Sequence, residues 1–315
     1  MSVQSSELKH TEPRLNYVTC ASPAGAHRMA YWEWGKSDNP NVLLCVHGLT
    51  RSGRDFDPLA RLMSDTYRVV CPDVVGRGRS DWLINPEFYA ITQYIADMFT
   101  LIARLSPAKL DWVGTSMGGL IGLGVAAALN LNSALCPHRC NHGLGSTQRL
   151  RLGKMVLNDI GPVIDANGLS RIADYVGQPK SFQSFDQAVD YIKAESAEFG
   201  KHTHEQWQDL TRNVFVQDNG QWVKHYDLRI ALPMAEETPE AIESSQSVLW
   251  PAYESLSEPI LIVRGEHSDL LSEHTVQLML QRNSNAKHIN VSDAGHAPTL
   301  RVPEQLNPIR QFLLD

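Results

Sequence analysis

Short apolar runs rich in β-branched and aromatic residues fill the first half of the chain and return near its end. Gly, Pro, Asn and Asp residues bound most of these runs, and this pattern predicts β-strands. We expect eight strands, at residues 15–20, 27–34, 41–46, 67–71, 109–113, 154–157, 259–263 and 287–291.

Between these runs, apolar residues recur with the spacing of a helix. The clearest case is residues 90–105, where Ile91, Tyr94, Ile95 and Met98 lie on one face. Further helices are expected at residues 55–64, 116–129 and 274–281 and at the C-terminus. Strands that alternate with helices predict an α/β protein, with a mostly parallel sheet covered by helices on both faces.

Residues 162–250 interrupt this alternation. They are mostly amphipathic helix and contain no buried-strand run, although Asn219-Gly220 between two short apolar pairs predicts a hairpin. The strand–helix pattern returns afterwards. We therefore expect one core domain made of residues 1–161 and 251–315, with residues 162–250 inserted as a helical cap.

The amino-acid composition argues against some classes of function. The chain of 315 residues has 28 Lys and Arg against 35 Asp and Glu, a net charge of −7, which argues against a nucleic-acid partner. No apolar run is long enough to span a bilayer, so no membrane partner is expected. Five cysteines in a long chain and the absence of an apolar leader favour a cytoplasmic protein. The oligomeric state is not readable from the sequence.

The segment Gly114-Thr-Ser116-Met-Gly118 fits the pattern G-x-S-x-G. It follows an apolar strand and opens an apolar helix, which is the context in which this pattern forms a nucleophile elbow. The helix N-terminus behind Ser116 favours negative charge on a bound oxygen. We expect Ser116 to be a nucleophile.

A serine nucleophile needs a base and a carboxylate that orients the base. His296 follows the last predicted strand, and Asp269 follows the strand before it, so Ser116, Asp269 and His296 occur in the order expected of a triad. Asp159, at the end of the strand before the insertion, is the main alternative acid. Glu266 and Asp293 are weaker competitors, and His267 is a weaker candidate for the base.

An oxyanion hole needs two backbone N–H groups. The residue after the nucleophile, Met117, supplies the first, and Leu49, in the loop after the third strand, is the expected second donor. His47 precedes this donor. We expect its ring to hydrogen-bond the loop backbone and hold the amide of Leu49 in place.

Six stretches together resemble the α/β-hydrolase superfamily over nearly the whole chain. They are His47-Gly48, residues 73–81 (DVVGRGRSD), 114–119 (GTSMGG) and 157–162 (LNDIGP), Ser268-Asp269 and residues 295–298 (GHAP). Within it, the chain resembles capped bacterial esterase-like serine hydrolases. The resemblance implies the α/β-hydrolase fold, an eight-stranded mostly parallel sheet with an inserted helical cap over the site.

The same resemblance implies a serine hydrolase that cleaves small-molecule carboxylic esters through an acyl-enzyme, without a cofactor. Dehalogenases and epoxide hydrolases of the superfamily carry an Asp nucleophile, whereas position 116 is Ser. Thr115 and Ala297 replace the Asn and Trp often found in hydrolases of meta-cleavage products. A lactonase, a carbon–carbon bond hydrolase and a non-catalytic ligand-binding relative remain the alternatives.

One further cluster contains metal-ligating residue types. Cys136, His138, Cys140 and His142 lie within seven residues of one another, between the helix that follows Ser116 and the next strand. We interpret this segment as a loop insertion without a metal, so no metal site is predicted.

Overall fold

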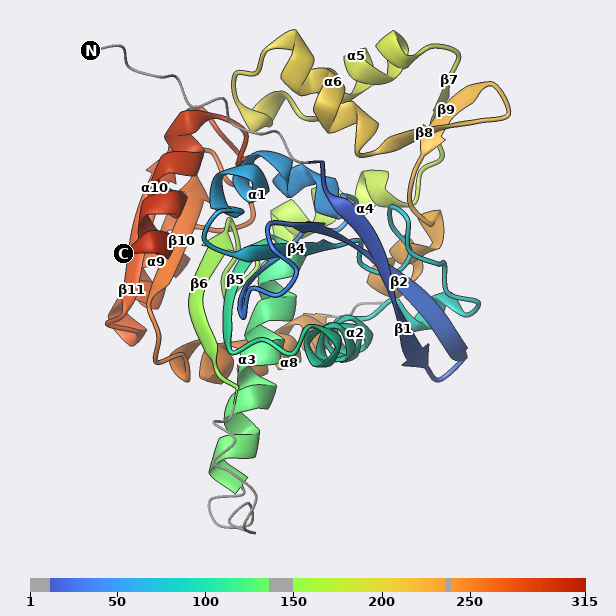
Figure 1. Cartoon of the computed structure of the whole chain (residues 1–315). Coiled ribbons are helices and arrows are strands. Elements are labelled where there is room, and N and C mark those ends of the chain that lie inside the picture. Colours follow the sequence, from blue (N-terminus) through green and yellow to red (C-terminus); the bar gives the residue numbers. More distant parts are fainter. Residues whose placement is uncertain (1–11, 136–149, 236–238) are drawn as a thin grey trace, which may run out of the picture.

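One sheet organises the chain. The computed structural model describes residues 12–135, 150–235 and 239–315, and it places eight strands in the order β1-β2-β4-β3-β5-β6-β10-β11 (Figure 1). The strands are β1 (Arg14–Ser22), β2 (Gly25–Trp34), β3 (Asn41–Val46), β4 (Arg68–Pro72), β5 (Lys109–Thr115), β6 (Leu152–Asn158), β10 (Ile260–Gly265) and β11 (Ala286–Val291). The predicted α/β-hydrolase fold is confirmed.

The direction of the strands determines where loops meet. The β1–β2 and β2–β4 pairs are antiparallel, whereas β4, β3, β5, β6, β10 and β11 run parallel to their neighbours. The C-terminal ends of parallel strands lie along one edge of a sheet, which is where ligands bind in open α/β folds. The loops after β3, β5, β6, β10 and β11 therefore gather at one edge.

Helices cover both faces of the sheet. Leu43 and Cys45 of β3 belong to the same buried cluster as α1 (Asp57–Met63) and α10 (Pro303–Leu314). The alternate residues of β3 face the other cluster, because successive strand side chains point to opposite faces. That cluster includes residues of α2 (Ile91–Leu105), α3 (Met117–Leu135), α8 (Pro239–Glu254) and α9 (Glu273–Arg282). Within the described part of the chain, no helix is long and apolar enough to cross a membrane.

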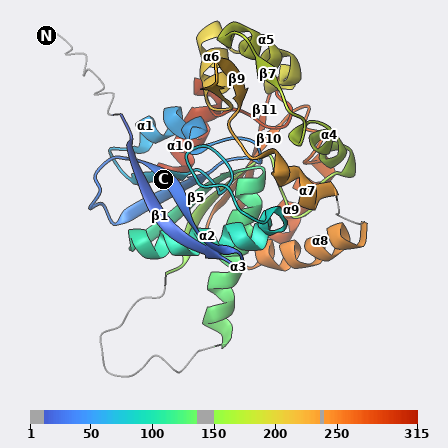
Figure 2. The same cartoon turned by 90° about the vertical axis from the view of Figure 1, so that its right-hand side faces the viewer.

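The inserted segment lies above the edge where the strand ends gather (Figures 1 and 2). It contains α4 (Ala166–Val176), α5 (Phe185–Glu195), α6 (His204–Arg212) and α7 (Ala231–Ala235). It also contains a small sheet of β7 (Ser181–Phe182), β9 (Gln221–Lys224) and β8 (Phe215–Asp218). The predicted hairpin is confirmed, with Asn219 and Gly220 both at positive φ between β8 and β9. Single 3-10 turns complete the described elements: Gly53–Phe56, Pro86–Phe88, Ala197–Phe199 and Leu228–Ile230.

Helix α8 crosses residue 250, where the cap was expected to end. It packs against α3, away from α5 and α6, so most of α8 lies with the core (Figures 1 and 2). Just beyond α8, the side-chain amide of Asn130 on α3 donates to the carbonyl oxygen of Ser255 at 3.1 Å. Packing against the core helix α3 is therefore already present in α8.

The start of α3 packs very closely against the end of β3. A Cβ atom at Gly118 would collide with the backbone carbonyl of Val46, and a Cβ atom at Gly114 would collide with the backbone of Gly118. Backbone atoms cannot move aside as a flexible side chain can. The two glycines of the G-x-S-x-G pattern thus allow the strand and the helix to approach each other around Ser116.

We predict that Gly118→Ala lowers the free energy of unfolding by about 2 kcal/mol or more, because overpacking at a backbone contact forces β3 and α3 apart. Gly48→Ala is the matched control, since its added methyl group meets nothing closer than 3.7 Å. Urea titration of both variants measures the effect. Equal stability of the two variants would contradict the packing argument.

Candidate active site

Ser116 occupies a sharp turn between β5 and α3. Its φ is +51°, in the left-handed region that residues with a side chain rarely adopt. Its N–H donates to the carbonyl oxygen of Asn158 at 2.9 Å, which ties the turn to the end of β6. The serine therefore lies at the C-terminal edge of the sheet, on the strand-to-helix turn that the sequence pattern predicts.

Ser116, His296 and Asp159 form a chain of hydrogen bonds across three strand ends. The Ser116 Oγ atom lies 2.8 Å from His296 Nε2, and His296 Nδ1 lies 2.7 Å from Asp159 Oδ2. An ionised carboxylate only accepts hydrogen bonds, so Nδ1 carries the hydrogen and Nε2 is free to accept from the serine hydroxyl. This geometry suits a serine activated by a neighbouring base.

The Asp159 carboxylate is fully buried and fully hydrogen-bonded. Its Oδ1 atom accepts from the N–H of Gly265 at 2.8 Å, and its Oδ2 atom accepts from the Ser268 hydroxyl at 2.6 Å as well as from His296. Its own N–H donates to the Val263 carbonyl at 2.7 Å. Burying a charge is costly unless it is paired and hydrogen-bonded. These contacts hold the carboxylate in a fixed position against the imidazole.

The predicted contact between Asp269 and His296 is not made. Both oxygens of Asp269 accept from Arg171 on α4, at 2.6 and 2.9 Å. The turn after β10 directs Ser268 toward Asp159 and leaves Asp269 facing the cap, which corrects the expectation that Asp269 orients the histidine. The hydrogen bond from Arg171 lowers the pKa of Asp269, partial burial opposes this, and the nearby His296 lowers it further.

The loop that carries Leu49 is held by two side chains. His47 Nδ1 donates to the Gly48 carbonyl at 2.7 Å, and Arg77 Nε donates to the Leu49 carbonyl at 2.8 Å. The C=O and N–H of a trans peptide point in opposite directions, so anchoring the Gly48 carbonyl directs the N–H of Leu49 away from His47. The expectation that the His47 ring binds the loop backbone is confirmed.

The other predicted amide donor is Met117. It is the first residue of α3, and the first N–H groups of a helix have no acceptor within the helix. Leu49 and Ser116 line the same cavity, with Met117 next to Ser116 in the chain. The roles of Leu49 and Met117 as oxyanion donors remain a prediction.

Three supporting residues were not identified from the sequence. Ser268 binds Asp159, Arg77 binds the Leu49 carbonyl, and the side-chain amide of Asn158 donates to Thr115 Oγ1 at 3.0 Å and to the Pro298 carbonyl at 2.9 Å. All three lie in stretches that carry the family resemblance. The signal was therefore present, but the sequence alone does not show which neighbours each side chain contacts.

A cavity lies in front of Ser116 and is bounded by both core and cap. The core contributes the loops around Leu49 and His296, and the cap contributes residues from α4 to β9. The cap residues are both apolar and polar: Arg171, Ile172, Tyr175, Tyr191, Ile192, Glu195, Ser196, Glu198, Phe199, Leu210, Val214, Lys224 and Tyr226. The inserted segment therefore forms part of the wall of this cavity.

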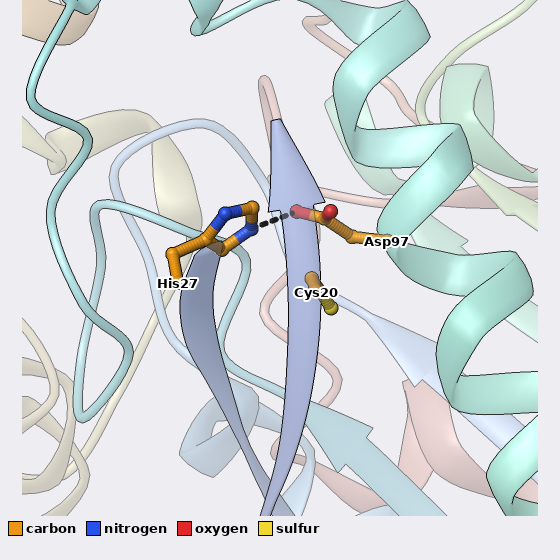
Figure 3. Close-up of side chains that lie close together, drawn as sticks. All are labelled: Cys20, His27 and Asp97. Atoms are coloured by element: carbon orange, nitrogen blue, oxygen red, sulfur yellow. Dashed lines mark hydrogen bonds and ion pairs between the residues drawn. The ribbon is translucent and has the colours of Figure 1, made fainter. Parts of the chain in front are cut away.

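Among the residues that the structure describes, two groups of side chains outside this cavity could ligate a metal. Cys20, His27 and Asp97 are buried where β1, β2 and α2 meet, and His27 Nε2 lies 2.9 Å from Asp97 Oδ2 (Figure 3). Asp97 also accepts from the side chain of Gln93 at 2.7 Å, so this cluster already forms a hydrogen-bonded network. The second group, Glu266, His267 and Asp293, is exposed. The Cys136, His138, Cys140 and His142 cluster lies outside the described residues.

Comparisons with known proteins agree with this fold. The sequence profile of the α/β hydrolase family matches residues 43–309. A crystal structure of an α/β hydrolase from Novosphingobium aromaticivorans superposes with a TM-score of 0.79 at 32% identity, covering 96% of this chain and 99% of that one.

Two curated relatives have stated activities. The 3-hydroxybutyrate-oligomer hydrolase of Cupriavidus necator is 45% identical over 304 residues, which cover 95% of this chain and 97% of the relative. The 2-(acetamidomethylene)succinate hydrolase of Mesorhizobium japonicum is 26% identical over 274 residues, which cover 86% of this chain and 87% of that protein.

The environment of His47 generates a pH prediction. The ring is buried, and its Nε2 atom accepts from the Val74 N–H at 2.9 Å, so it cannot also carry a proton. Burial lowers the pKa of His47 to about 4. Below the ordinary histidine pKa, His47 binds a proton in the unfolded chain but not in the folded protein. Stability is therefore full above this value and falls as the pH decreases toward 4.

We expect His47 to account for a loss of about 3 kcal/mol between pH 6.5 and 4, from a shift of roughly 2.5 units at 1.36 kcal/mol each. The variant His47→Asn lacks this titration. Its free energy of unfolding should be lower at pH 7 but should fall less steeply toward pH 4, as measured by urea titration at each pH. Parallel curves for both proteins would contradict the prediction.

Proposed function

Because the chain belongs to the α/β hydrolase family, we propose that it is a serine hydrolase that cleaves short oligoesters of a 3-hydroxy acid. The observation that carries this proposal is the hydrogen-bonded chain Ser116–His296–Asp159 at the floor of the capped cavity. In it, Ser116 is the nucleophile, His296 the general base and acid, and Asp159 the residue that orients the imidazole.

The reaction takes place in two halves. The Ser116 oxygen attacks the ester carbonyl while His296 Nε2 removes the hydroxyl proton. The tetrahedral intermediate then expels the alcohol, which receives that proton from His296, and the acyl group remains on Ser116. In the second half, His296 removes a proton from a water molecule, which attacks the acyl group on Ser116. The carboxylic acid is released and the serine is regenerated. Asp159 stabilises the imidazolium that forms in each half.

The developing oxyanion needs donors that are in place before the reaction. The amides of Leu49 and Met117 are the proposed donors. Support for Leu49 comes from the two anchors on its loop, His47 and Arg77, which fix the peptide without using its N–H. Support for Met117 comes from its position at the start of α3, where the helix dipole also favours negative charge.

The substrate class rests on similarity together with the cavity. A relative that is 45% identical over almost the full length of both chains is a 3-hydroxybutyrate-oligomer hydrolase. The cavity offers apolar contacts through Ile172, Ile192 and Phe199, and polar contacts through tyrosine and charged side chains. A hydroxy-acid oligoester presents the same mixture of methyl groups and polar ends.

The proposed nucleophile gives the first test. Ser116→Ala should abolish hydrolysis of a 3-hydroxybutyrate dimer and of p-nitrophenyl acetate by several orders of magnitude, because no other group can form the acyl-enzyme. Product release measured by chromatography checks the dimer, and absorbance checks the activated ester. Ser37→Ala is a control that removes a hydroxyl group from an exposed turn and keeps the nucleophile. Near-normal turnover by Ser116→Ala would refute the assignment.

A second test separates the two carboxylates. Asp159→Asn should reduce kcat/KM by about ten-thousandfold, the loss seen when a triad imidazole has the wrong tautomer. Asp269→Asn makes the same chemical change in a half-exposed ion pair with Arg171, so its effect should stay within about tenfold. Steady-state kinetics on the dimer gives the ranking. The reverse order would make Asp269 the acid.

The same substrates distinguish the alternative functions. A lactonase would open a ring ester faster than the linear dimer, and a carbon–carbon bond hydrolase would cleave a vinylogous diketone but not the dimer. A ligand-binding relative without catalysis would turn over neither the dimer nor p-nitrophenyl acetate. Preference for the linear dimer supports the proposal.

A further inference from the structure

In the part of the chain that the structure describes, three lysine and arginine side chains line the cavity in front of Ser116, and two of them form ion pairs. Arg51 holds Asp55 through bonds of 2.6 and 2.7 Å, and Arg171 holds Asp269 in the same way. Lys224 differs from both. Within residues 12–135, 150–235 and 239–315, no carboxylate forms an ion pair with its Nζ atom.

The Lys224 ammonium group is buried and still has a free donor. The residue is only 9% exposed, and its Nζ atom donates to the carbonyls of Tyr175 and Gln178, both at 2.9 Å. An ammonium group has three N–H donors, so two carbonyls leave one available. The Tyr226 ring centroid lies 5.4 Å away. None of these contacts carries a negative charge. The Glu195 carboxylate lines the same cavity and raises the pKa of Lys224 from a distance, but the two groups form no ion pair.

The hydrogen bonds from Lys224 to the carbonyls at and just beyond the end of α4 explain only part of its position. A lysine near a helix C-terminus often binds the last carbonyls, as Lys224 does. It can do so while its charge stays in water, yet this charge is buried on the wall of the cavity. Lysines are almost never buried unless they are paired. Burial lowers the pKa of Lys224 to about 8, so the group is still mostly protonated at pH 7.

The proposed substrate brings a negative charge at a defined place. In a linear oligoester of a hydroxy acid, the acyl side of the cleaved bond ends in a hydroxyl group. The alcohol side, which leaves first, ends in a free carboxylate. The carboxylate therefore belongs to the leaving group and is present only before the acyl-enzyme has formed.

We propose that Lys224 binds this terminal carboxylate and makes the enzyme selective for oligoesters with a free acid end. The inference rests on the proposed function and adds the residue that recognises one end of the substrate. The third N–H of Lys224 donates to a carboxylate oxygen, which gives the buried cation a charged partner. Neutral esters lack this contact and bind without it.

The step at which Lys224 acts follows from the chemistry. A dimer with a free acid end and the same dimer with a terminal carboxamide give the same acyl-enzyme. Any difference between them therefore arises in binding and acylation, and deacylation is common to both. Loss of Lys224 should change kcat/KM for the acid while leaving the rate of the shared deacylation step unaltered.

The experiment compares kcat/KM for the 3-hydroxybutyrate dimer and for its terminal carboxamide in wild type, Lys224→Met, Lys224→Arg, Arg171→Met and Lys201→Met. Lys201→Met is the control, since the Lys201 side chain is 94% exposed and does not line the cavity. The preference of the wild type for the acid should fall about tenfold or more in Lys224→Met, because a charge-assisted hydrogen bond is lost. Lys224→Arg should recover part of it, and Lys201→Met should retain it.

The ratio of kcat/KM for the acid to kcat/KM for the carboxamide corrects for any general loss of activity or stability. An unchanged ratio in Lys224→Met, or an equal fall for both substrates, would reduce Lys224 to a structural role and overturn the inference. Loss of the preference in Arg171→Met but not in Lys224→Met would assign the carboxylate to Arg171. A wild type that hydrolyses p-nitrophenyl acetate but neither dimer would refute the proposed substrate class itself.

Discussion

The buried Asp159 carboxylate is the interaction on which the rest of the site depends. Parallel β6 and β10 are neighbours, and Asp159 joins them by accepting hydrogen bonds from Gly265 and Ser268. The carboxylate also accepts a hydrogen bond from His296 Nδ1. This contact holds the ring so that its Nε2 atom faces the Ser116 hydroxyl. A charge buried in this way is stable only while every partner is present. The arrangement of Ser116, His296 and Asp159 therefore depends on the pairing of β6 with β10.

The cap is coupled to this centre through charges. Asp269, which follows Ser268 in the same turn, is held by Arg171 of α4, so the turn that supports Asp159 on one side holds the cap on the other. Arg51 joins the oxyanion loop to the cap through the Leu210 carbonyl at 3.2 Å. The inserted segment is thus held over the cavity by contacts with the loops that carry Leu49 and Asp269.

Sequence reasoning was most successful where function depends on local structure. The strands, the elbow at Ser116 and the loop around His47 each follow from patterns within a few residues, and the structure places them as expected. The acid could not be decided in this way. Asp159 and Asp269 both follow strands that are neighbours in the sheet, so both approach the histidine. The structure distinguishes their contacts: Asp159 is hydrogen-bonded to His296, whereas Asp269 pairs with Arg171, 98 positions away in the chain.

The burial of Lys224 could not be predicted from the sequence either. The hairpin of β8 and β9 was predicted from Asn219-Gly220, but its position over the cavity depends on α4, whose carbonyls accept from Lys224. An alternating strand pattern gives the face of a residue and not its partner in another element. The contacts that residues of the inserted segment make across the cavity are therefore the least predictable part of this molecule.

The most direct test of the proposed chemistry is to detect the acyl-enzyme itself. The protein would be mixed with the 3-hydroxybutyrate dimer, quenched in acid within milliseconds to seconds, and examined by intact-mass and peptide mass spectrometry. One hydroxybutyryl group should appear on the peptide that contains Ser116 and should disappear as turnover ends. Attachment to a different residue, or turnover by a Ser116→Ala protein at the wild-type rate, would contradict a mechanism built on Ser116.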